Sequence, residues 1–200
     1  MIKHLLAATA LFVLPLSIAA PAQAQSMDKK FHTITVEREL EHSAEEVWAA
    51  VAEDYGNIAN THPAIYASEY IEGSLEGSLG AERSCAFDDK GKAWTYEKIV
   101  EWDPENMRFV NAVTSSQNYP LDTDNSRGIY TVEALPGGGS VLHMTFEYRT
   151  KPAFLGGMVG KQFDTLLSQY LMSVDYHLET GNTVNQDTFE QVLSHYSNMM

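Results

Sequence analysis

The sequence predicts an α+β domain in which seven antiparallel strands curve around one long C-terminal helix, with two short helices after the first strand. Residues 31–40 alternate between apolar and polar side chains, as a half-buried strand does. Residues 66–150 form short β-rich runs separated by turn residues, and apolar residues then recur at helical spacing from 155 to 178. A sheet followed by a single long amphipathic helix favours two layers, in which the helix covers one face of the sheet.

The first 24 residues have the features of a secretory signal peptide. Lys3 and His4 give a short basic start, and residues 5–18 are almost all apolar. Ala22 and Ala24 are small residues at the two positions that a signal peptidase reads. The apolar run is shorter than the roughly twenty residues that cross a bilayer, which disfavours a permanent membrane anchor. We therefore expect cleavage after Ala24 and a periplasmic or secreted protein without stable membrane insertion.

Length and composition favour one domain with an apolar core. We expect residues 25–183 to form that domain and residues 184–200 to form a tail with a short helix. The single cysteine, Cys85, cannot form a disulfide within the chain, and we interpret it as a small buried residue on a strand. The formal net charge of -14 disfavours nucleic acid and anionic membranes as partners, because both repel an acidic surface.

The segment after the first strand predicts the two short helices. Ser43 and Glu46 have the spacing of a capping box, which starts a helix that continues to about Glu53. We expect Gly56 to end this helix and residues 57–63 to form a second helical turn followed by a loop.

Six further strands are predicted at residues 66–72, 81–87, 94–102, 107–114, 127–135 and 140–149. The segments between them are rich in Gly, Pro, Asp, Asn and Ser, which favour turns. Because the connections are mostly short, consecutive strands should pair as an antiparallel meander.

A long helix is predicted from about Pro152 to Gly181, with a length of about 43 Å at 1.5 Å per residue. Its apolar stripe is Leu155, Val159, Phe163, Leu166, Leu167, Tyr170, Leu171, Val174 and Leu178. Phe189, Val192, Leu193 and Tyr196 have helical spacing as well, which predicts a short extra helix docked outside the domain.

Four short strings are similar to those of a known family. Residues 45–48 (EEVW) are similar to its first helix, and residues 54–63 (DYGNIANTHP) to the turn that follows it. Residues 79–83 (LGAER) are similar to its Gly-X-X-Arg strand entry, and residues 97–104 (EKIVEWDP) to its middle strand and Asp-Pro turn. With the order of elements, they resemble the START-like superfamily, also called SRPBCC or Bet v 1-like, and its polyketide cyclase/dehydrase-like group. The resemblance implies a helix-grip fold with an internal pocket.

The resemblance leaves the activity open, because this superfamily includes lipid and sterol carriers, hormone receptors, aromatase/cyclases and ubiquinone-binding proteins. We favour the binding of a small hydrophobic molecule, which is lipid, polyketide-like or aromatic. The alternative is a cyclase- or dehydratase-type enzyme acting on a polyketide-like or aromatic substrate in the same cavity. The sequence has no nucleophile motif and no glycine-rich phosphate loop in the right context, and its histidines do not cluster, so we expect neither a cofactor nor a metal.

The sequence is rich in tyrosine, with ten residues, and this points to the nature of the cavity. A tyrosine offers an apolar ring and one hydroxyl, which suits a cavity for a flat or apolar ligand with few polar groups. Ordinary core packing is the alternative. The candidate ligand-binding residues on strands, a loop and the long helix are Tyr66, Tyr96, Tyr119, Tyr130, Tyr148 and Tyr170, together with the inward positions Met144 and Phe146.

Glu97 and His62 are the candidates for proton transfer, because either could move a proton if it were buried. Glu97 lies on a predicted strand, but alternation does not place it: Tyr96 and Trp102 compete with Ile99 for the inner face. Its alternative is an exposed residue near Lys98 or Arg83. For His62 the alternative is a loop residue packed at the rim of the domain.

The start of the long helix is a candidate entrance to the cavity. Three glycines in its first turns, at positions 156, 157 and 160, lower helix propensity by about 1 kcal/mol each relative to alanine. We predict a gate in which Leu155, Met158 and Tyr119 close over the ligand. The alternative is that the glycines allow the helix to pack closely against the sheet.

Overall fold

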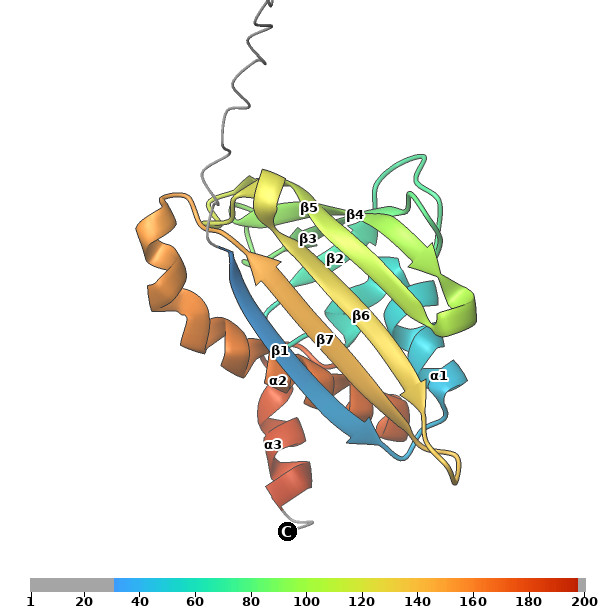
Figure 1. Cartoon of the computed structure of the whole chain (residues 1–200). Coiled ribbons are helices and arrows are strands. Elements are labelled where there is room, and N and C mark those ends of the chain that lie inside the picture. The colour runs from blue at the N-terminus through green and yellow to red at the C-terminus, as the bar shows by residue number, and fades with distance from the viewer. Residues whose placement is uncertain (1–30, 198–200) are drawn as a thin grey trace, which may run out of the picture.

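The computed structural model describes residues 31–197 and contains the predicted helix-grip arrangement. A seven-stranded antiparallel sheet curves around the long helix α2 (Gly156–Thr180), as Figure 1 shows. The predicted signal peptide, residues 1–24, lies outside the described residues.

The seven strands lie close to their predicted positions. They are β1 (His32–Leu40), β2 (Ala67–Tyr70), β3 (Glu82–Ala86), β4 (Trp94–Asp103), β5 (Arg108–Gln117), β6 (Arg127–Ala134) and β7 (Ser140–Tyr148). Short 3-10 helices η3 (Pro104–Asn106) and η4 (Thr123–Asn125) lie in the connections on either side of β5.

The sheet has the order β1-β7-β6-β5-β4-β3-β2. Strands β2 to β7 form the predicted meander, and β1 is added beside β7, where Thr35 and Thr145 hydrogen-bond at 3.0 Å. The register of β4 against β5 shifts between Tyr96 and Glu97 and again between Ile99 and Glu101. Such irregularities change which side chains face inward. Thr95 and Ile99 are buried at odd positions, whereas beyond the second shift Trp102 at an even position packs on Trp48.

Helix α1 (Ala44–Trp48) begins with the predicted capping box. The Ser43 hydroxyl accepts from the Glu46 amide, and the Glu46 carboxylate accepts from the Ser43 amide. The chain continues through a π-helical turn, η1 (Ala49–Glu53), into the 3-10 helix η2 (Tyr55–Asn60). The prediction that Gly56 ends the first helix is wrong, because α1 and the π-helical turn η1 after it end at Glu53, and Gly56 lies inside η2. A side chain at Gly56 would collide with the Tyr70 ring, so close packing explains this glycine.

The core lies between the inner face of the sheet and the helices. Trp48 packs against Phe109 of β5, and α2 contributes Leu167, Leu171 and Val174. A short 3-10 helix, η5 (Ala153–Leu155), precedes α2. Gly181 ends α2 in the left-handed conformation with φ of 70°, and its amide donates to His177 O.

The tail packs on α2 through helix α3 (Phe189–Ser197). Val184, Val192 and Tyr176 form a small buried cluster, and the Tyr196 hydroxyl donates to Asp175, which also pairs with Arg38 of β1. The tail reaches η2 as well, because the Val184 amide donates to Asn60 O at 2.8 Å. The tail therefore connects α2, β1 and the loop after η2.

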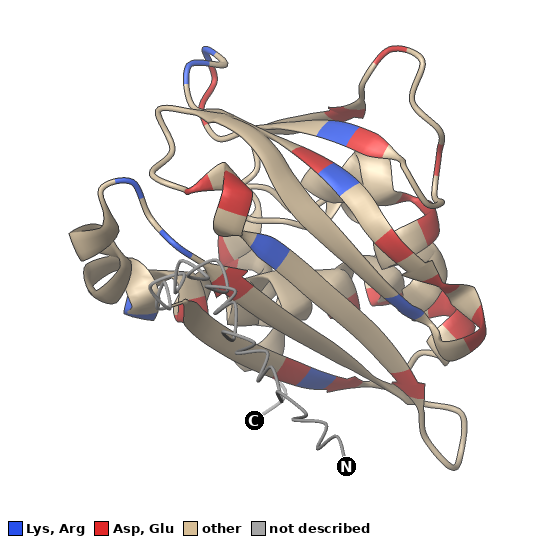
Figure 2. Cartoon of the chain, turned by 45° about the horizontal axis from the view of Figure 1, so that its top comes forward, with Lys and Arg blue, Asp and Glu red and all other residues tan. Residues whose placement is uncertain are grey.

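Acidic residues, red in Figure 2, are spread over strands, helices and loops of the chain. Several form ion pairs across neighbouring strands on the outer face, such as Lys98 with Glu82 and Arg127 with Glu147. Within residues 31–197, the structure contains no helix that is both long and apolar enough to cross a membrane.

Candidate functional site

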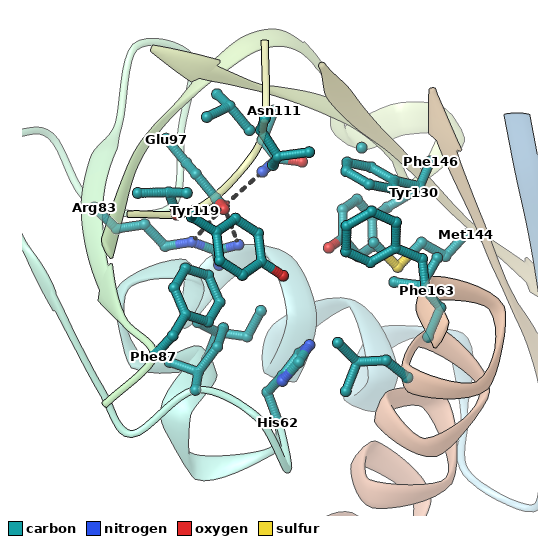
Figure 3. A pocket seen from close by; sticks show the side chains of 18 residues that line it. His62, Arg83, Phe87, Glu97, Asn111, Tyr119, Tyr130, Met144, Phe146 and Phe163 are labelled. Carbon is teal, nitrogen blue, oxygen red and sulfur yellow. Dashed lines mark hydrogen bonds and ion pairs between the residues drawn. The ribbon is translucent and has the colours of Figure 1, made fainter. Parts of the chain in front are cut away.

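A cavity of about 80 Å³ lies between the inner face of the sheet, the segment around η2 and helix α2. Figure 3 shows its walls from close by. It is lined by Ile58, His62, Ile65, Arg83, Phe87, Thr95, Glu97, Asn111, Val113, Tyr119, Leu121, Gly128, Tyr130, Met144, Phe146, Phe163, Leu166 and Leu167. Most of these side chains are apolar or aromatic. The polar side chains of Arg83, Thr95, Glu97 and Asn111 lie on β3, β4 and β5, and His62 lies on the loop after η2.

The apolar wall is built from β6, β7 and α2. Met144 and Phe146 alternate with outward residues on β7, and Phe163 of α2 packs edge-on against Phe146 with ring centroids 5.5 Å apart. The Tyr130 ring stacks on Phe109 at 4.4 Å. Rings held in this way present a flat apolar surface to the cavity.

The polar wall is centred on the carboxylate of Glu97. Arg83 donates to Glu97 Oε2 from Nε at 3.1 Å and from Nη2 at 2.7 Å. Asn111 Nδ2 donates to the same oxygen at 2.8 Å, and the Thr95 hydroxyl donates to Oε1 at 3.2 Å. A partly buried carboxylate with these donors is compensated in charge and in hydrogen bonding. Glu97 therefore holds Arg83 and Asn111 in place, and its oxygens are engaged by protein donors.

Arg83 is itself held on the other side. Its side chain is 3% exposed, its Nη1 donates to Tyr55 O at 2.8 Å, and its guanidinium lies 3.9 Å from the centroid of the Tyr55 ring. The guanidinium is therefore fixed by a carboxylate, a carbonyl and an aromatic face.

His62 enters the cavity from the loop after η2. Its ring stacks on Tyr170 at 4.9 Å, and its Nδ1 accepts from the Ala64 amide at 3.1 Å. Burial, with a smaller contribution from the charge on Arg83, lowers the pKa of His62 to about 3. At neutral pH the ring is therefore uncharged, and since Nδ1 accepts, its proton lies on Nε2.

Tyr119 and Phe87 form a stacked pair in the wall, with centroids 4.1 Å apart and planes 7° from parallel. Burial raises the pKa of Tyr119 to about 12, so its hydroxyl stays protonated at neutral pH. Phe87, Tyr119 and Leu166 are only partly buried, which places them where the cavity approaches the surface.

The structure brings six of the predicted site residues together in the cavity wall. They are Tyr119, Tyr130, Met144, Phe146, Glu97 and His62. The alternative readings of Glu97 as an exposed residue and of His62 as a rim residue do not describe their positions, because both face this cavity (Figure 3).

Tyr148 and Tyr170 are buried but lie behind the wall. The Tyr148 hydroxyl donates to Gly156 O at 2.9 Å, and its ring packs against Phe163, which does line the cavity. Tyr170 supports His62 from behind in the same way. Core packing, the alternative considered for these tyrosines, describes both.

Four predicted ligand-binding residues lie away from the cavity. Tyr66 precedes the edge strand β2 and is 55% exposed, and Tyr96 points outward because Thr95 and Glu97 on either side of it point inward. Met158 is 71% exposed on the outer side of α2, and Leu155 lies in η5, half-buried and outside the lining. None of the four lines the cavity that the described residues enclose, and the predicted role of Leu155 and Met158 in a gate stays a prediction.

Sequence reasoning missed Arg83, Asn111, Phe87 and Phe163 as cavity residues. The alternation of β5 contained a signal for Asn111, because Phe109, Asn111 and Val113 share the inward parity and all three are buried. For Arg83 the sequence offers only the family string and a possible place beside an exposed Glu97. Cys85 is fully buried on β3 as expected, and burial raises the pKa of its thiol to about 12. Within residues 31–197, no group of three or more His, Cys, Asp and Glu side chains could hold a metal ion.

Comparison with known proteins identifies the family. A family model described as "Polyketide cyclase / dehydrase and lipid transport" matches residues 32–174. A glycerol kinase of Trichodesmium erythraeum (strain IMS101) is 24% identical over 122 residues, which is 60% of this chain and 22% of the kinase. The chain thus spans about a fifth of the length of that curated relative.

Solved structures with the same fold include plant and bacterial proteins. Ara h 8.0201 has a TM-score of 0.61 at 19% identity and covers 76% of this chain and 99% of its own. A Thalictrum flavum norcoclaurine synthase point mutant, solved with a transition-state analogue, has a TM-score of 0.58 at 17% identity, covering 74% and 94%. An uncharacterised protein from Bacillus thuringiensis has a TM-score of 0.56 at 15% identity, covering 74% and 98%. With the family match over most of the described residues and this shared fold, the chain belongs to the polyketide cyclase/dehydrase and lipid transport family of the Bet v 1-like superfamily.

Proposed function

We propose that this protein binds one small, mainly apolar ligand in the cavity between the sheet and α2. The observation that supports this most directly is the lining itself. Aromatic and aliphatic side chains form most of the wall, and a few fixed polar groups gather at one side. This composition is typical of small-molecule sites, in which apolar walls supply affinity and a few polar atoms fix orientation.

The polar groups favour binding over proton transfer. Arg83 and Asn111 donate hydrogen bonds to Glu97 Oε2 and so occupy this oxygen. The low pKa of His62, about 3, makes its ring a weak base at neutral pH. Both side chains are thus better suited to shaping and orienting a ligand than to abstracting a proton from it.

The volume of about 80 Å³ sets a limit on the ligand unless the wall moves. An apolar cavity of about 150 Å³ is known to hold benzene. The cavity is about half that volume, so even a ligand with one aromatic ring requires side chains to move. Phe87, Tyr119 and Leu166 are the candidates because they are partly exposed already. We propose that ligands enter there, past the stacked pair of Phe87 and Tyr119.

We also propose that the protein acts outside the cytoplasm, after removal of residues 1–24. Lys3, the apolar run 5–18 and the small residues Ala22 and Ala24 support this proposal. N-terminal sequencing of the protein purified from its native host should begin at Gln25. A protein that retains Met1 would contradict the proposal.

The binding proposal is tested by titration with an environment-sensitive apolar dye. Saturable binding of about one dye per chain is expected, with a rise in Tm that grows with dye concentration. Met144→Trp fills the cavity from β7 and should abolish binding. His143→Trp is the matched control. His143 is the neighbour of Met144 on β7, but its side chain points outward, with Nδ1 3.3 Å from Glu37 Oε2. Equal binding by both variants, or no saturable binding at all, would rule the cavity out as the site.

A further inference from the structure

Asn111 has a side-chain oxygen with no partner inside the cavity wall. The residue is 5% exposed, and its Oδ1 is fully buried without a hydrogen bond. The amide orientation is fixed, because Nδ2 donates to the Glu97 carboxylate, which can only accept. Oδ1 therefore turns away from Glu97, as Figure 3 shows. A buried acceptor that lacks its hydrogen bond is costly, which makes such an atom a marker of an unmet contact.

Gly128 keeps the space beside this oxygen open. It lies opposite Asn111 in the register of β5 and β6, and it lines the same cavity. A Cβ at this position would lie 2.6 Å from Asn111 Oδ1 and 3.1 Å from the Tyr130 ring. Any residue other than glycine would thus displace or cover the oxygen. Asn111 Oδ1 is thus a buried, unpaired acceptor that lies against the backbone of Gly128 in the cavity wall.

The charges in the wall disfavour an anionic ligand. Among the described residues that line the cavity, Arg83 carries the positive charge, and its guanidinium is already bound by Glu97. The carboxylate or phosphate of a lipid would meet Glu97 and the oxygen of Asn111, and both repel it. A neutral group that donates one hydrogen bond fits the same place.

We propose that Asn111 Oδ1 accepts a hydrogen bond from the ligand, and that the ligand is an uncharged apolar molecule with a hydroxyl group. This inference rests on the proposed binding function and narrows it to one chemical class. Phenols and alcohols with apolar bodies belong to that class, whereas free fatty acids and phosphorylated lipids do not. Asn111 is then the residue that selects for the hydroxyl, with Gly128 holding its contact surface open.

Three matched probes test the proposal by fluorine NMR on the whole protein. Para-fluorophenol donates a hydrogen bond, para-fluoroanisole has the same ring without the donor, and para-fluorobenzoate has the ring with a negative charge. The phenol should bind about tenfold tighter than the anisole, because only the phenol pairs with the buried acceptor. The benzoate should bind more weakly than both.

Variants assign the effect to the oxygen. Gly128→Ala places a methyl group beside Oδ1 and should bring the phenol-to-anisole ratio to about one, while anisole still binds. Asn111→Leu removes the oxygen and should have the same effect on the ratio. If Asn111→Leu does not fold, Gly128→Ala alone decides the test. Tyr55→Phe is the control, since the buried Tyr55 hydroxyl also lacks a partner. This variant should leave the ratio unchanged.

The outcomes separate the two proposals. Equal binding of phenol and anisole, or tightest binding of benzoate, overturns the hydroxyl assignment and leaves the binding function standing. A preference for phenol over anisole that appears only in Tyr55→Phe also overturns the hydroxyl assignment. In that case the Tyr55 hydroxyl would donate to Asn111 Oδ1 in the native protein. Absence of saturable binding by all three probes contradicts the binding function itself.

Discussion

At the scale of single residues, the buried charge of Arg83 determines much of its surroundings. The guanidinium lies inside the fold, and its compensation comes from Glu97, Tyr55 and, through Glu97, Asn111. Removal of one member of a buried pair leaves the other uncompensated in a medium of low polarity. The adjacent pair Lys98 and Glu82 lies on the same two strands but on the outer face, where solvent screens it.

Glu97→Gln should lower the free energy of unfolding by about 3 kcal/mol, because Arg83 then keeps a buried charge without its counter-ion. The matched control Glu82→Gln should cost less than about 1 kcal/mol, because that pair is more than a third exposed. Urea denaturation of both variants measures the difference. Equal losses of unfolding free energy in the two variants would show that the inner pair contributes no more to stability than the outer pair.

His62 should make stability depend on pH. Its pKa is lowered from 6.5 to about 3 in the folded protein, so between these values the unfolded chain binds a proton that the folded chain does not. Stability is therefore complete above pH 6.5 and falls as pH decreases, by about 1.4 kcal/mol per pH unit. Between pH 7 and pH 5, the protein should lose about 2 kcal/mol more than His62→Asn does. Urea denaturation at both pH values measures these losses. An equal loss of unfolding free energy in the native protein and in His62→Asn would contradict this assignment.

The inner positions of β7 could be predicted from the sequence because alternation there is unbroken, and Met144 and Phe146 line the cavity as expected. Glu97 could not be placed, and the reason is physical. The register of β4 shifts near this residue, so Thr95 and Ile99 face inward at odd positions while Trp102 does so at an even one. The polar cluster of Arg83, Glu97 and Asn111 joins three strands, and the local pattern of any one strand does not contain it.

At the scale of elements, the order of strands and helices followed from short-range patterns, but glycines were harder to interpret. Gly56 reads as a helix end and is instead a packing position against Tyr70. In α2, an added Cβ at Gly156 would lie 2.5 Å from His32 Nε2, and at Gly160 it would lie 3.2 Å from the Tyr148 hydroxyl. Close packing thus explains two of the three glycines, whereas a Cβ on Gly157 would meet nothing within 4 Å.

Alanine substitutions in α2 should separate the two kinds of glycine. Gly157→Ala should raise stability by about 0.5–1 kcal/mol, because alanine favours the helix and the site is open. Gly156→Ala should lower stability, because its methyl group displaces the His32 ring from its stack on Tyr148. Thermal unfolding of both variants gives the comparison. A gain in both would mean that neither glycine is required for packing.

At the scale of the whole molecule, the tail links parts of the domain that are distant in sequence. Val184 bonds to Asn60 beside the loop that carries His62, and Tyr196 reaches Asp175 and thereby Arg38. This tail lies beyond the family match, which ends at residue 174. Sequence periodicity predicts a helix here, but the contacts of that helix with η2 and β1 depend on the folded arrangement.

A chain that ends at Gly181 should keep the sheet but lose about 2–4 kcal/mol of stability, because Val184 and Val192 no longer cover Tyr176. It should also bind the dye more weakly, since the backbone next to His62 loses its bond to the tail. Tyr196→Phe is the milder control and should cost about 1 kcal/mol with unchanged dye binding. Unaltered stability of the shortened chain would show that the tail is not part of the folding unit.

The pairing of β1 with β7 has a consequence for the order of folding events. Thr35 and Thr145 are partners across 110 residues of chain, so the first strand has no neighbour until the last strand has been synthesised. Closing so long a loop costs entropy before the contacts between β1 and β7 form, and contacts between residues so distant in sequence slow folding. The emerging polypeptide should therefore stay without its completed sheet through most of its synthesis on the ribosome. In refolding experiments, protection of the β1 amides should appear in the same late step as that of β7.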